Sequence, residues 1–377
     1  MKHVVILGCG IIGATLAYEL SRVPGYQITV IDPRPPATGA TQAALGVLMG
    51  TISQKLKGRA WQLRRVSLER YQTLIPELER KTGREIPGNH QGILLLCSET
   101  DDLQKWQHLV TVRQSQGLSL EIWPVKQLQQ QCPHLNYQGI QAGIYSPDDR
   151  QLDPVALTLA LVAGAKLNGV QFHWETTVEQ YVVTRSESTS YRCIEIQFDH
   201  SISKSQPVDW LVVAAGLGSS QVLTSLPTPS AIEEKLQIPQ IRPVLGQALE
   251  VHCDQPLGNS QFQPVITYND VHLVPVGESN YWVGATVEFP SETDQVSADP
   301  TKLATVFQKA VEFCPQLADS QPVRQWSGLR PRPDGVPAPV LGKYQGYDNV
   351  LLATGHYRNG ILLAPGTAQV ICDLIRV

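Results

Sequence analysis

Three glycines near the N-terminus have the types and spacing that dinucleotide binding requires. Gly8, Gly10 and Gly13 directly follow a hydrophobic run, and Asp32 ends the next one. The first glycine permits a tight turn, the second lets the backbone approach a pyrophosphate, and the third lets the following helix pack on the strand. The positive end of that helix would then face the phosphates. With strand, turn, helix, strand and acid in this order, the motif predicts a nucleotide-binding unit.

Asp32 indicates which nucleotide the motif would accept. Its carboxylate can accept hydrogen bonds from both ribose hydroxyls, and it would repel a 2′-phosphate, so NADP fits poorly. We expect Ile11, Ile12 and Pro33, which neighbour the motif, to contact the ligand as well. The motif alone leaves open whether the ligand is NAD or FAD.

A stretch of small residues, 38–46, follows this unit. Small residues let a backbone lie close against a ligand. The candidate contacts here are Ala40, Thr41, Ala44, Leu45 and Gly46, together with the adjacent Val47.

The C-terminal run Gly355–Pro365 is the most specific string in the chain. A helix starting near Ile361 would direct free backbone N–H groups at the N1/C2 carbonyl edge of a flavin, which becomes anionic on reduction. Gly355 and Gly360 would allow the close approach. Because the flavin of FAD lies far from its adenine, distant chain segments must converge on it. The return of the C-terminal run to the nucleotide site therefore favours FAD over NAD. The other candidate contacts in the run are His356, Tyr357, Arg358, Asn359 and Leu362.

The hydrophobic pattern predicts elements that leave the nucleotide site and return to it. Strands are expected at 4–7, 27–31, 92–96, 170–174, 210–216 and 350–355, and helices at 60–81, 99–116, 154–166, 298–312 and 361–374. A polar meander is expected from 175 to about 209, and the alternation over 243–289 indicates antiparallel strands. Val178, Ala215 and Gly216 are further candidate nucleotide contacts.

Composition argues against several functional classes. The net charge of −4 gives no overall attraction to nucleic acid or to an anionic membrane, and no apolar stretch reaches the roughly 18–20 residues of a membrane span. The 7 cysteines are scattered without a Cys-x-x-Cys pair, and the 9 histidines show no metal-type spacing, so we expect neither a disulfide framework nor a metal site. We therefore expect a cytoplasmic protein.

Together these segments resemble the D-amino-acid oxidase superfamily and, within it, the glycine oxidase (ThiO) branch. Besides Gly355–Pro365, the resemblance rests on Ala44–Leu48, Leu211–Gly216 and Gly328–Gly335, and it spans essentially the whole chain. It implies FAD as the cofactor. Relatives that bind flavin covalently use a cysteine just before the Gly-Leu-Arg-Pro segment, and this chain has none in Gln325–Leu329, so the FAD is expected to be non-covalent.

The resemblance implies an α/β fold with two interleaved domains. One would be an FAD-binding Rossmann-like domain of the glutathione-reductase type, comprising residues 1–85, 150–225 and 335–377. The other would be an α+β substrate domain with an antiparallel sheet, comprising residues 86–149 and 226–334.

The resemblance also assigns three catalytic-site residues. In the resembling oxidases the arginine matching Arg330 clamps the amino-acid carboxylate over the flavin, and a guanidinium is a rigid, permanently charged fork that suits this task. A surface or core-bridging arginine is the alternative for Arg330. Arg358 is expected to contact the flavin or the active site, with a structural role or a carboxylate partner as its alternative. His272 stands where glycine oxidases usually carry a tyrosine near the substrate, with a structural role as its alternative. Val47 and Val287 replace two methionines, so strict glycine preference is not implied.

The implied reaction is amine oxidation by hydride transfer from the Cα of glycine or a similar small amino acid to flavin N5. Reoxidation by O2 would give H2O2, and the imine would hydrolyse to a 2-oxo acid and ammonia. A place in thiamine biosynthesis and a homo-oligomeric state are further implications, with no nucleic-acid or membrane partner. One alternative is an FAD-dependent dehydrogenase that passes electrons to a quinone or protein. Another is an NAD-binding dehydrogenase or a non-catalytic nucleotide-binding regulator, for which the run Gly355–Pro365 would have no use.

Overall fold

The computed structural model describes residues 1–186, 190–198, 205–227, 239–291 and 295–376. Its nucleotide-side sheet has six strands in the order β19-β20-β13-β1-β2-β9. All neighbours are parallel except β19, which runs antiparallel to β20. The strands are β1 (Lys2–Leu7), β2 (Tyr26–Asp32), β9 (Gln171–Trp174), β13 (Trp210–Val213), β19 (Val340–Lys343) and β20 (Val350–Thr354). The α/β class is confirmed, and strands far apart in the sequence meet in this sheet as expected.

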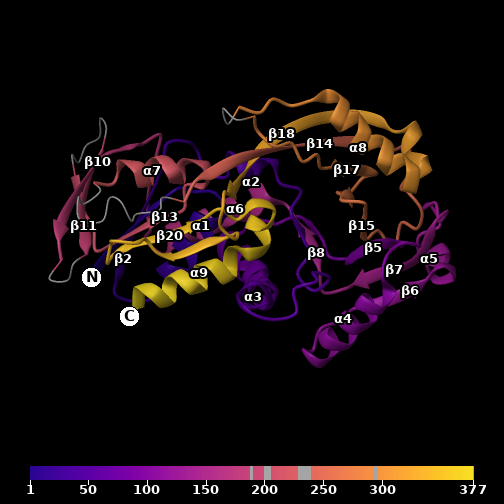
Figure 1. Ribbon diagram of the computed structural model, residues 1–377, viewed down its shortest axis with the longest axis horizontal. Coiled ribbons are helices and arrows are strands. Elements are labelled where there is room, and N and C mark those ends of the chain that lie inside the picture. Colours follow the sequence, from indigo (N-terminus) through magenta and orange to yellow (C-terminus); the bar gives the residue numbers. More distant parts are fainter. Residues whose placement is uncertain (187–189, 199–204, 228–238, 292–294, 377) are drawn as a thin grey trace.

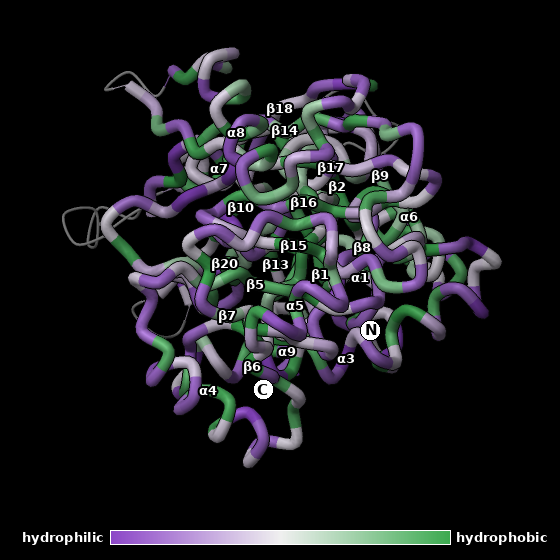
Figure 2. The backbone as a smooth tube through the Cα atoms, turned by 90° about the vertical axis from the view of Figure 1, so that its right-hand side faces the viewer, coloured by the Kyte–Doolittle hydropathy of each residue, from purple (hydrophilic) through white to green (hydrophobic). Residues whose placement is uncertain are grey.

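Four helices pack around one another beside this sheet: α1 (Ile11–Ser21), α3 (Arg59–Thr82), α6 (Pro154–Leu167) and α9 (Gly360–Arg376). Helix α1 contacts both α6 and α9, and α3 contacts α6 and α9. The largest apolar cluster joins their buried faces to β1, and Figure 2 shows hydrophobic stretches gathered centrally around β1 and β13. Asp153 begins α6 by accepting the N–H groups of Val155 and Ala156 at 2.8 Å, the cap that its sequence predicts.

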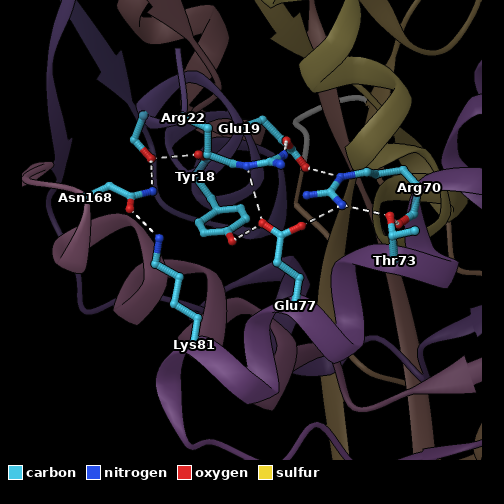
Figure 3. Close-up of polar contacts among 9 residues, drawn as sticks. Tyr18, Glu19, Arg22, Arg70, Thr73, Glu77, Lys81 and Asn168 are labelled. Carbon is cyan, nitrogen blue, oxygen red and sulfur yellow. Dashed lines mark hydrogen bonds and ion pairs between the residues drawn. The ribbon is translucent and has the colours of Figure 1, made fainter. Parts of the chain in front are cut away.

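A polar network on the outer side of these helices holds α1 in place (Figure 3). Arg70 of α3 lies between two carboxylates, with Nε 2.6 Å from Glu19 and Nη1 2.9 Å from Glu77. The Tyr18 hydroxyl of α1 donates to Glu77 at 2.5 Å, so both helices share the same acid. Because α1 begins at the glycine motif, this network also fixes the direction in which its N-terminus points.

The second sheet has eight strands in the order β18-β14-β17-β16-β15-β5-β7-β6. They are β5 (Ile93–Ser98), β6 (Glu121–Pro124), β7 (Ile140–Ser146), β14 (Ile241–His252), β15 (Val265–Tyr268), β16 (Val271–Pro275), β17 (Asn280–Gly284) and β18 (Gln321–Pro333). The expected antiparallel pairing is confirmed over β14–β17, but β15 joins β5 in parallel. That parallel pair unites two segments far apart in the sequence into one sheet.

Helices cover both faces of this second sheet. Helix α8 (Pro300–Phe313) packs on β14, β16 and β17, and α5 (Val125–Gln131) packs near β6 and β7 on the same face. Helix α4 (Leu103–Ser115) packs near β6 on the opposite face. Figure 1 shows β5–β7 and α4 on the right, with α9 and the nucleotide-side sheet to the left of them. Helix α4 begins later than the predicted 99–116 because Asp101 and Asp102 form a turn and a cap before it.

Two small sheets and five further short helices complete the described chain. The first small sheet joins β3 (Val47–Leu48), β8 (Arg150–Leu152) and β4 (Gly88–Asn89). The second joins β10 (Val178–Arg185), β11 (Tyr191–Phe198) and β12 (Ser205–Pro207), so the predicted polar meander is an antiparallel sheet where it is described. Residues 187–189 and 199–204 of that meander lie outside the described residues. The other short helices include α2 (Ala40–Ala43), α7 (Ser219–Ser225), η1 (Gly216–Gly218), η3 (Pro315–Asp319) and η4 (Tyr357–Asn359).

Candidate functional site

A cavity of about 1140 Å³ is lined by residues of both large sheets, and it brings almost every predicted site residue together. The lining includes the predicted nucleotide contacts, which come from the N-terminal motif, the small-residue stretch, positions 178 and 215–216, and the C-terminal run. The three predicted catalytic-site residues, His272, Arg330 and Arg358, also line it. Two predicted residues do not line it, namely Gly13 and Asn359.

Gly8 and Gly13 show why the first turn needs glycine. Gly8 has φ +103°, and a Cβ there would lie 2.5 Å from the carbonyl oxygen of Ala214. A Cβ on Gly13 would lie 1.9 Å from the carbonyl oxygen of Gly8, so this glycine packs the helix on the strand. The backbone N–H of Ile11 donates to the Thr41 hydroxyl at 3.1 Å, which links the helix N-terminus to the small-residue stretch.

Asp32 lies at the carboxyl end of β2 with both carboxylate oxygens engaged by backbone groups. Its Oδ2 accepts the N–H of Cys9 at 2.7 Å and its Oδ1 accepts the N–H of Arg34 at 2.9 Å. Each oxygen retains further acceptor capacity, and the residue lines the cavity. This position suits the two hydroxyls of a ribose.

The segment around Gly46 is pinned to β8 with no room for a side chain. Gly46 has φ +72°, and a Cβ there would lie 1.8 Å from the carbonyl oxygen of Leu152. The Gln151 side chain donates to the carbonyl oxygen of Leu45 at 3.1 Å. Residues 44–47 therefore present backbone and small side chains to the cavity in one fixed arrangement.

Asp149, which sequence reasoning missed, fixes the chain just beyond this segment. Its carboxylate accepts the backbone N–H groups of Gly50, Thr51 and Ile52, each at 2.8 Å. The side chain is fully buried. A lone aspartate in a loop carries no sequence signal for this role, because its partners are almost a hundred residues away.

Arg330 extends across the second sheet toward the end of β17. Its Nη1 donates to the carbonyl oxygens of Leu245 at 3.2 Å and Thr286 at 3.0 Å. A Cβ on Gly246 would lie 2.1 Å from Nη2, so this glycine makes the space that the guanidinium occupies. No ion pair involves Arg330 within the described ranges, and burial, together with the charge of Arg358, lowers its pKa. The guanidinium is thus fixed by backbone carbonyl groups and lines the cavity, and no carboxylate pairs with it in the described structure.

His272 and Arg358 lie at the same end of the cavity. The Nδ1 of His272 is 2.9 Å from the Thr267 hydroxyl, and Arg358 Nη2 is 3.3 Å from Asp270, whose side chain is 80% exposed. Burial, with the charge of Arg358 next in size, lowers the pKa of His272 to about 4. His272 is therefore neutral at physiological pH. Tyr357, next to Arg358, holds φ +54°, a left-handed conformation that is rare for a bulky residue.

Two aromatic side chains that line the cavity were also missed. Trp282 and Trp326 lie edge to face with ring centroids 5.6 Å apart, and the Arg324 guanidinium lies 4.8 Å from the Trp326 ring. The Trp326 indole N–H donates to the carbonyl oxygen of Ala43 at 3.2 Å, which joins β18 to α2. The alternation of Arg324, Trp326, Gly328 and Arg330 was the available signal, because these positions share one strand face.

His356, which lines the cavity, is buried against Thr367, and its burial leads to a prediction for acid stability. Its Nε2 is 2.8 Å from the Thr367 hydroxyl, and burial lowers its pKa to about 3. Below pH 6.5 the unfolded chain binds a proton here that the folded chain does not, so the free energy of unfolding falls as pH falls. At pH 5 the contribution of His356 should lower the free energy of unfolding by about 2 kcal/mol relative to pH 7. Urea unfolding at pH 7, 6 and 5 should show a shallower pH slope for His356→Asn than for the native chain.

The exposed His108 provides the control for that experiment. His108→Asn should keep the native slope. An unchanged slope in His356→Asn would contradict the neutral, buried state of His356.

The remaining polar chemistry offers no second centre in the part of the chain that the structure describes. No group of three or more His, Cys, Asp or Glu side chains there could hold a metal ion. All 7 cysteines are buried free thiols. Over the same ranges, every helix is too short or too polar to cross a lipid bilayer.

Comparison with known proteins gives a match along almost the whole chain. A family model described as FAD dependent oxidoreductase matches residues 3–374. The bifunctional protein ThiO/ThiG of Nostoc sp. is 31% identical over 376 residues, which are 99% of this chain and 52% of that protein. The chain thus spans about half the length of this relative. The glycine oxidase of Bacillus subtilis is 28% identical over 374 residues, covering 98% of this chain and 92% of that enzyme.

Solved structures agree on the fold. The glycine oxidase from Geobacillus kaustophilus superposes with a TM-score of 0.82 at 22% identity, covering 100% of this chain and 95% of that one. An L-proline dehydrogenase from P. horikoshii also gives a TM-score of 0.82, at 19% identity over 99% of this chain and 93% of that one.

Proposed function

The chain belongs to the family of FAD-dependent oxidoreductases, and from this membership we propose that it oxidises glycine or similar small amino acids and passes the electrons to O2. The observation that carries the proposal is the Arg330 guanidinium. It faces the cavity, is held by two backbone carbonyls and has no carboxylate partner among the described residues. A guanidinium in this state is a receptor for the carboxylate of an incoming amino acid.

The residues around the cavity fit FAD. The Gly8 turn leaves no space for a side chain beside the α1 N-terminus, which suits a pyrophosphate. Asp32 would bind the ribose hydroxyls. The Gly46 segment and the start of α9 at Gly360 line the same cavity and would hold the flavin between them. We propose non-covalent binding, because no cysteine lines the cavity in the described chain.

The protein side chains then have one task, which is to orient the substrate. When bound, FAD supplies a two-electron acceptor for the Cα–H bond of the amine donor. Arg330 fixes the substrate carboxylate, and the acids that line the cavity in the described chain are Asp32 and Asp153. No lining carboxylate therefore stands at the Arg330 end to stabilise an ammonium group. This favours binding of the neutral amine, which needs no separate base, and positioning of this kind supplies up to about 7–11 kcal/mol.

Anaerobic mixing of the purified holoprotein with glycine, followed by admission of air, tests this function. We expect the visible flavin absorption to bleach and then to recover with release of hydrogen peroxide. Bleaching without recovery in air would show that O2 does not reoxidise the flavin. The protein would then be a dehydrogenase that uses another electron acceptor. Absence of bleaching with glycine, sarcosine and D-alanine would contradict small amino acids as donors.

Gly246→Ala tests the carboxylate receptor without touching Arg330. The new methyl group would meet the guanidinium at 2.1–2.3 Å, and Gly246 has no left-handed backbone that alanine would strain. The displaced Arg330 should raise KM for glycine, with a loss of about a hundredfold in kcat/KM. Steady-state kinetics and FAD content measure the two effects separately. Gly218→Ala is the matched control, because its Cβ would make only an ordinary 3.7 Å contact in the same cavity. Equal kinetics for Gly246→Ala and the native chain would contradict the receptor.

A further inference from the structure

A buried threonine contacts the histidine that faces the substrate end of the cavity. Thr267 of β15 lies opposite His272 of β16 in the antiparallel register, and its Oγ1 is 2.9 Å from His272 Nδ1. Thr267 is only 3% exposed. His272 is half-buried and lines the cavity. Thus one ring nitrogen is engaged by the protein, and the other, Nε2, has no partner among the described residues.

The hydroxyl of Thr267 determines which ring nitrogen carries the proton. A hydroxyl donates one hydrogen bond, and the described residues offer the Thr267 hydroxyl no acceptor other than His272 Nδ1. If Nδ1 carried the proton, the buried O–H would have no acceptor, which costs about 1–3 kcal/mol. The favoured arrangement therefore has the hydroxyl donating to Nδ1. The neutral ring then carries its proton on Nε2.

The sheet places this Nε2–H near the Arg330 guanidinium. His272 pairs with Gly284 of β17, Gly284 pairs with Ala248 of β14, and Arg330 of β18 lies on the same face. Gly246 and Gly284 put no side chain on the face between the two groups. Arg330 crosses this cleared face to reach the carbonyl of Thr286, just beyond β17. The guanidinium and the imidazole thus converge on one region of the cavity.

The charges around His272 keep the imidazole neutral. Arg358 of η4 and Arg330 of β18 both disfavour protonation, and Asp270 in the β15–β16 turn favours it. Burial is the largest effect, and the balance places the pKa at about 4. Above pH 5 His272 is therefore a hydrogen-bond donor without a charge.

We propose that Thr267 is a positioning residue, which holds His272 in the Nε2–H tautomer so that the imidazole donates a second hydrogen bond to the substrate carboxylate on Arg330. This inference rests on the proposed function, because it takes the Arg330 end of the cavity as the carboxylate site. It also separates two roles for His272. An Nε2–H imidazole donates to a carboxylate, and it does not accept a proton from the substrate amine.

Nitrogen NMR of the holoprotein reads the tautomer directly. In a sample labelled with ¹⁵N-histidine, the protonated and unprotonated ring nitrogens have separate shifts and distinct couplings to the ring protons. His272 is assigned by the signal lost in His272→Gln. We expect Nε2–H at pH 7 in the native chain and a mixture of tautomers in Thr267→Val. An Nδ1–H tautomer in the native chain would overturn the proposal.

Binding of acetate, followed through the flavin absorption spectrum, tests whether His272 donates to a carboxylate on Arg330. Thr267→Val keeps the shape of the side chain and should weaken acetate binding about tenfold, the equivalent of one hydrogen bond to a charged group. Thr267→Ser restores the hydroxyl and should bind acetate like the native chain. Equal acetate affinity for Thr267→Val and the native chain would overturn the inference.

The two proposals fail in different ways. A native holoprotein that neither binds acetate nor is reduced by amino acids would overturn both. A native holoprotein that is reduced by glycine but shows Nδ1–H on His272 would overturn only the role of Thr267.

Discussion

Replacing Arg330 with methionine is expected to lower kcat/KM for carboxylate-bearing amine donors by about a thousandfold, mostly through KM. The reason is the environment of the guanidinium. It is held by the carbonyl oxygens of Leu245 and Thr286 and has no carboxylate partner in the described structure, so its charge is available to the substrate. Methionine fills similar space and removes the charge. Steady-state kinetics with glycine and sarcosine measure the loss.

The matched control for this experiment lies two residues along the same strand. Arg332 is exposed, stacks on Phe289 at 5.4 Å and does not line the cavity. Arg332→Met should therefore leave the kinetics unchanged. FAD content and the thermal midpoint should be native in both variants, because neither arginine is among the proposed FAD contacts. A native KM in Arg330→Met would show that the carboxylate binds elsewhere in the cavity.

The nucleotide half of the fold is the part that sequence predicts well, because its signals are local. Gly8, Gly10 and Gly13 are needed within a single turn, and Asp32 ends the adjacent strand. Gly13 must be small because the carbonyl oxygen of Gly8, five residues earlier, lies against it, whereas the space at Gly8 is limited by Ala214, which follows the adjacent strand β13 and is distant in the sequence. The predicted bounds of α3, α6 and α9 agree with the structure to within about two residues, because α3 and α9 have a hydrophobic stripe and α6 begins at the Asp153 cap and ends at Asn168.

The second, eight-stranded sheet was harder to predict because pairing between distant segments creates it. Strand β18 extends over 13 residues, yet most of its side chains are exposed and three of its residues are prolines, so no hydrophobic alternation marks it. Its place at an edge of the sheet explains the prolines, which cannot donate to a ladder on both sides. The parallel pairing of β15 with β5 joins residues about 170 positions apart and has no sequence pattern of its own.

The candidate site shows the same division. The resemblance pointed to Arg330, and the structure adds that Gly246 makes the space for its guanidinium. The resemblance also pointed to His272, but its partner Thr267 lies on another strand, and their contact follows only from the register of β15 and β16. Trp282 and Trp326 contact one another across β14, so neither is informative in isolation.

Asp149 is the clearest case of a residue whose role follows only from the fold. Its carboxylate replaces water for three consecutive backbone N–H groups, those of Gly50, Thr51 and Ile52. Arg113 reinforces the same loop by donating to the carbonyl oxygens of Thr51, at 2.7 Å, and Ser53, at 2.7 Å. The loop continues from β3, which carries Val47 into the cavity. We therefore expect Asp149 to act on both stability and cofactor retention.

Asp149→Asn should lower the free energy of unfolding by about 3 kcal/mol, because hydrogen bonds to a charged group are lost and a buried donor is left unsatisfied. The asparagine oxygen can accept some of the three N–H groups, whereas its amide nitrogen would face a donor. Urea unfolding measures the loss, and FAD release on dilution measures the effect on the cavity. Asp148→Asn is the control, because that half-buried side chain accepts a single N–H, from Ser119 at 2.6 Å. Equal stability of the two variants would show that Asp149 does not hold the loop.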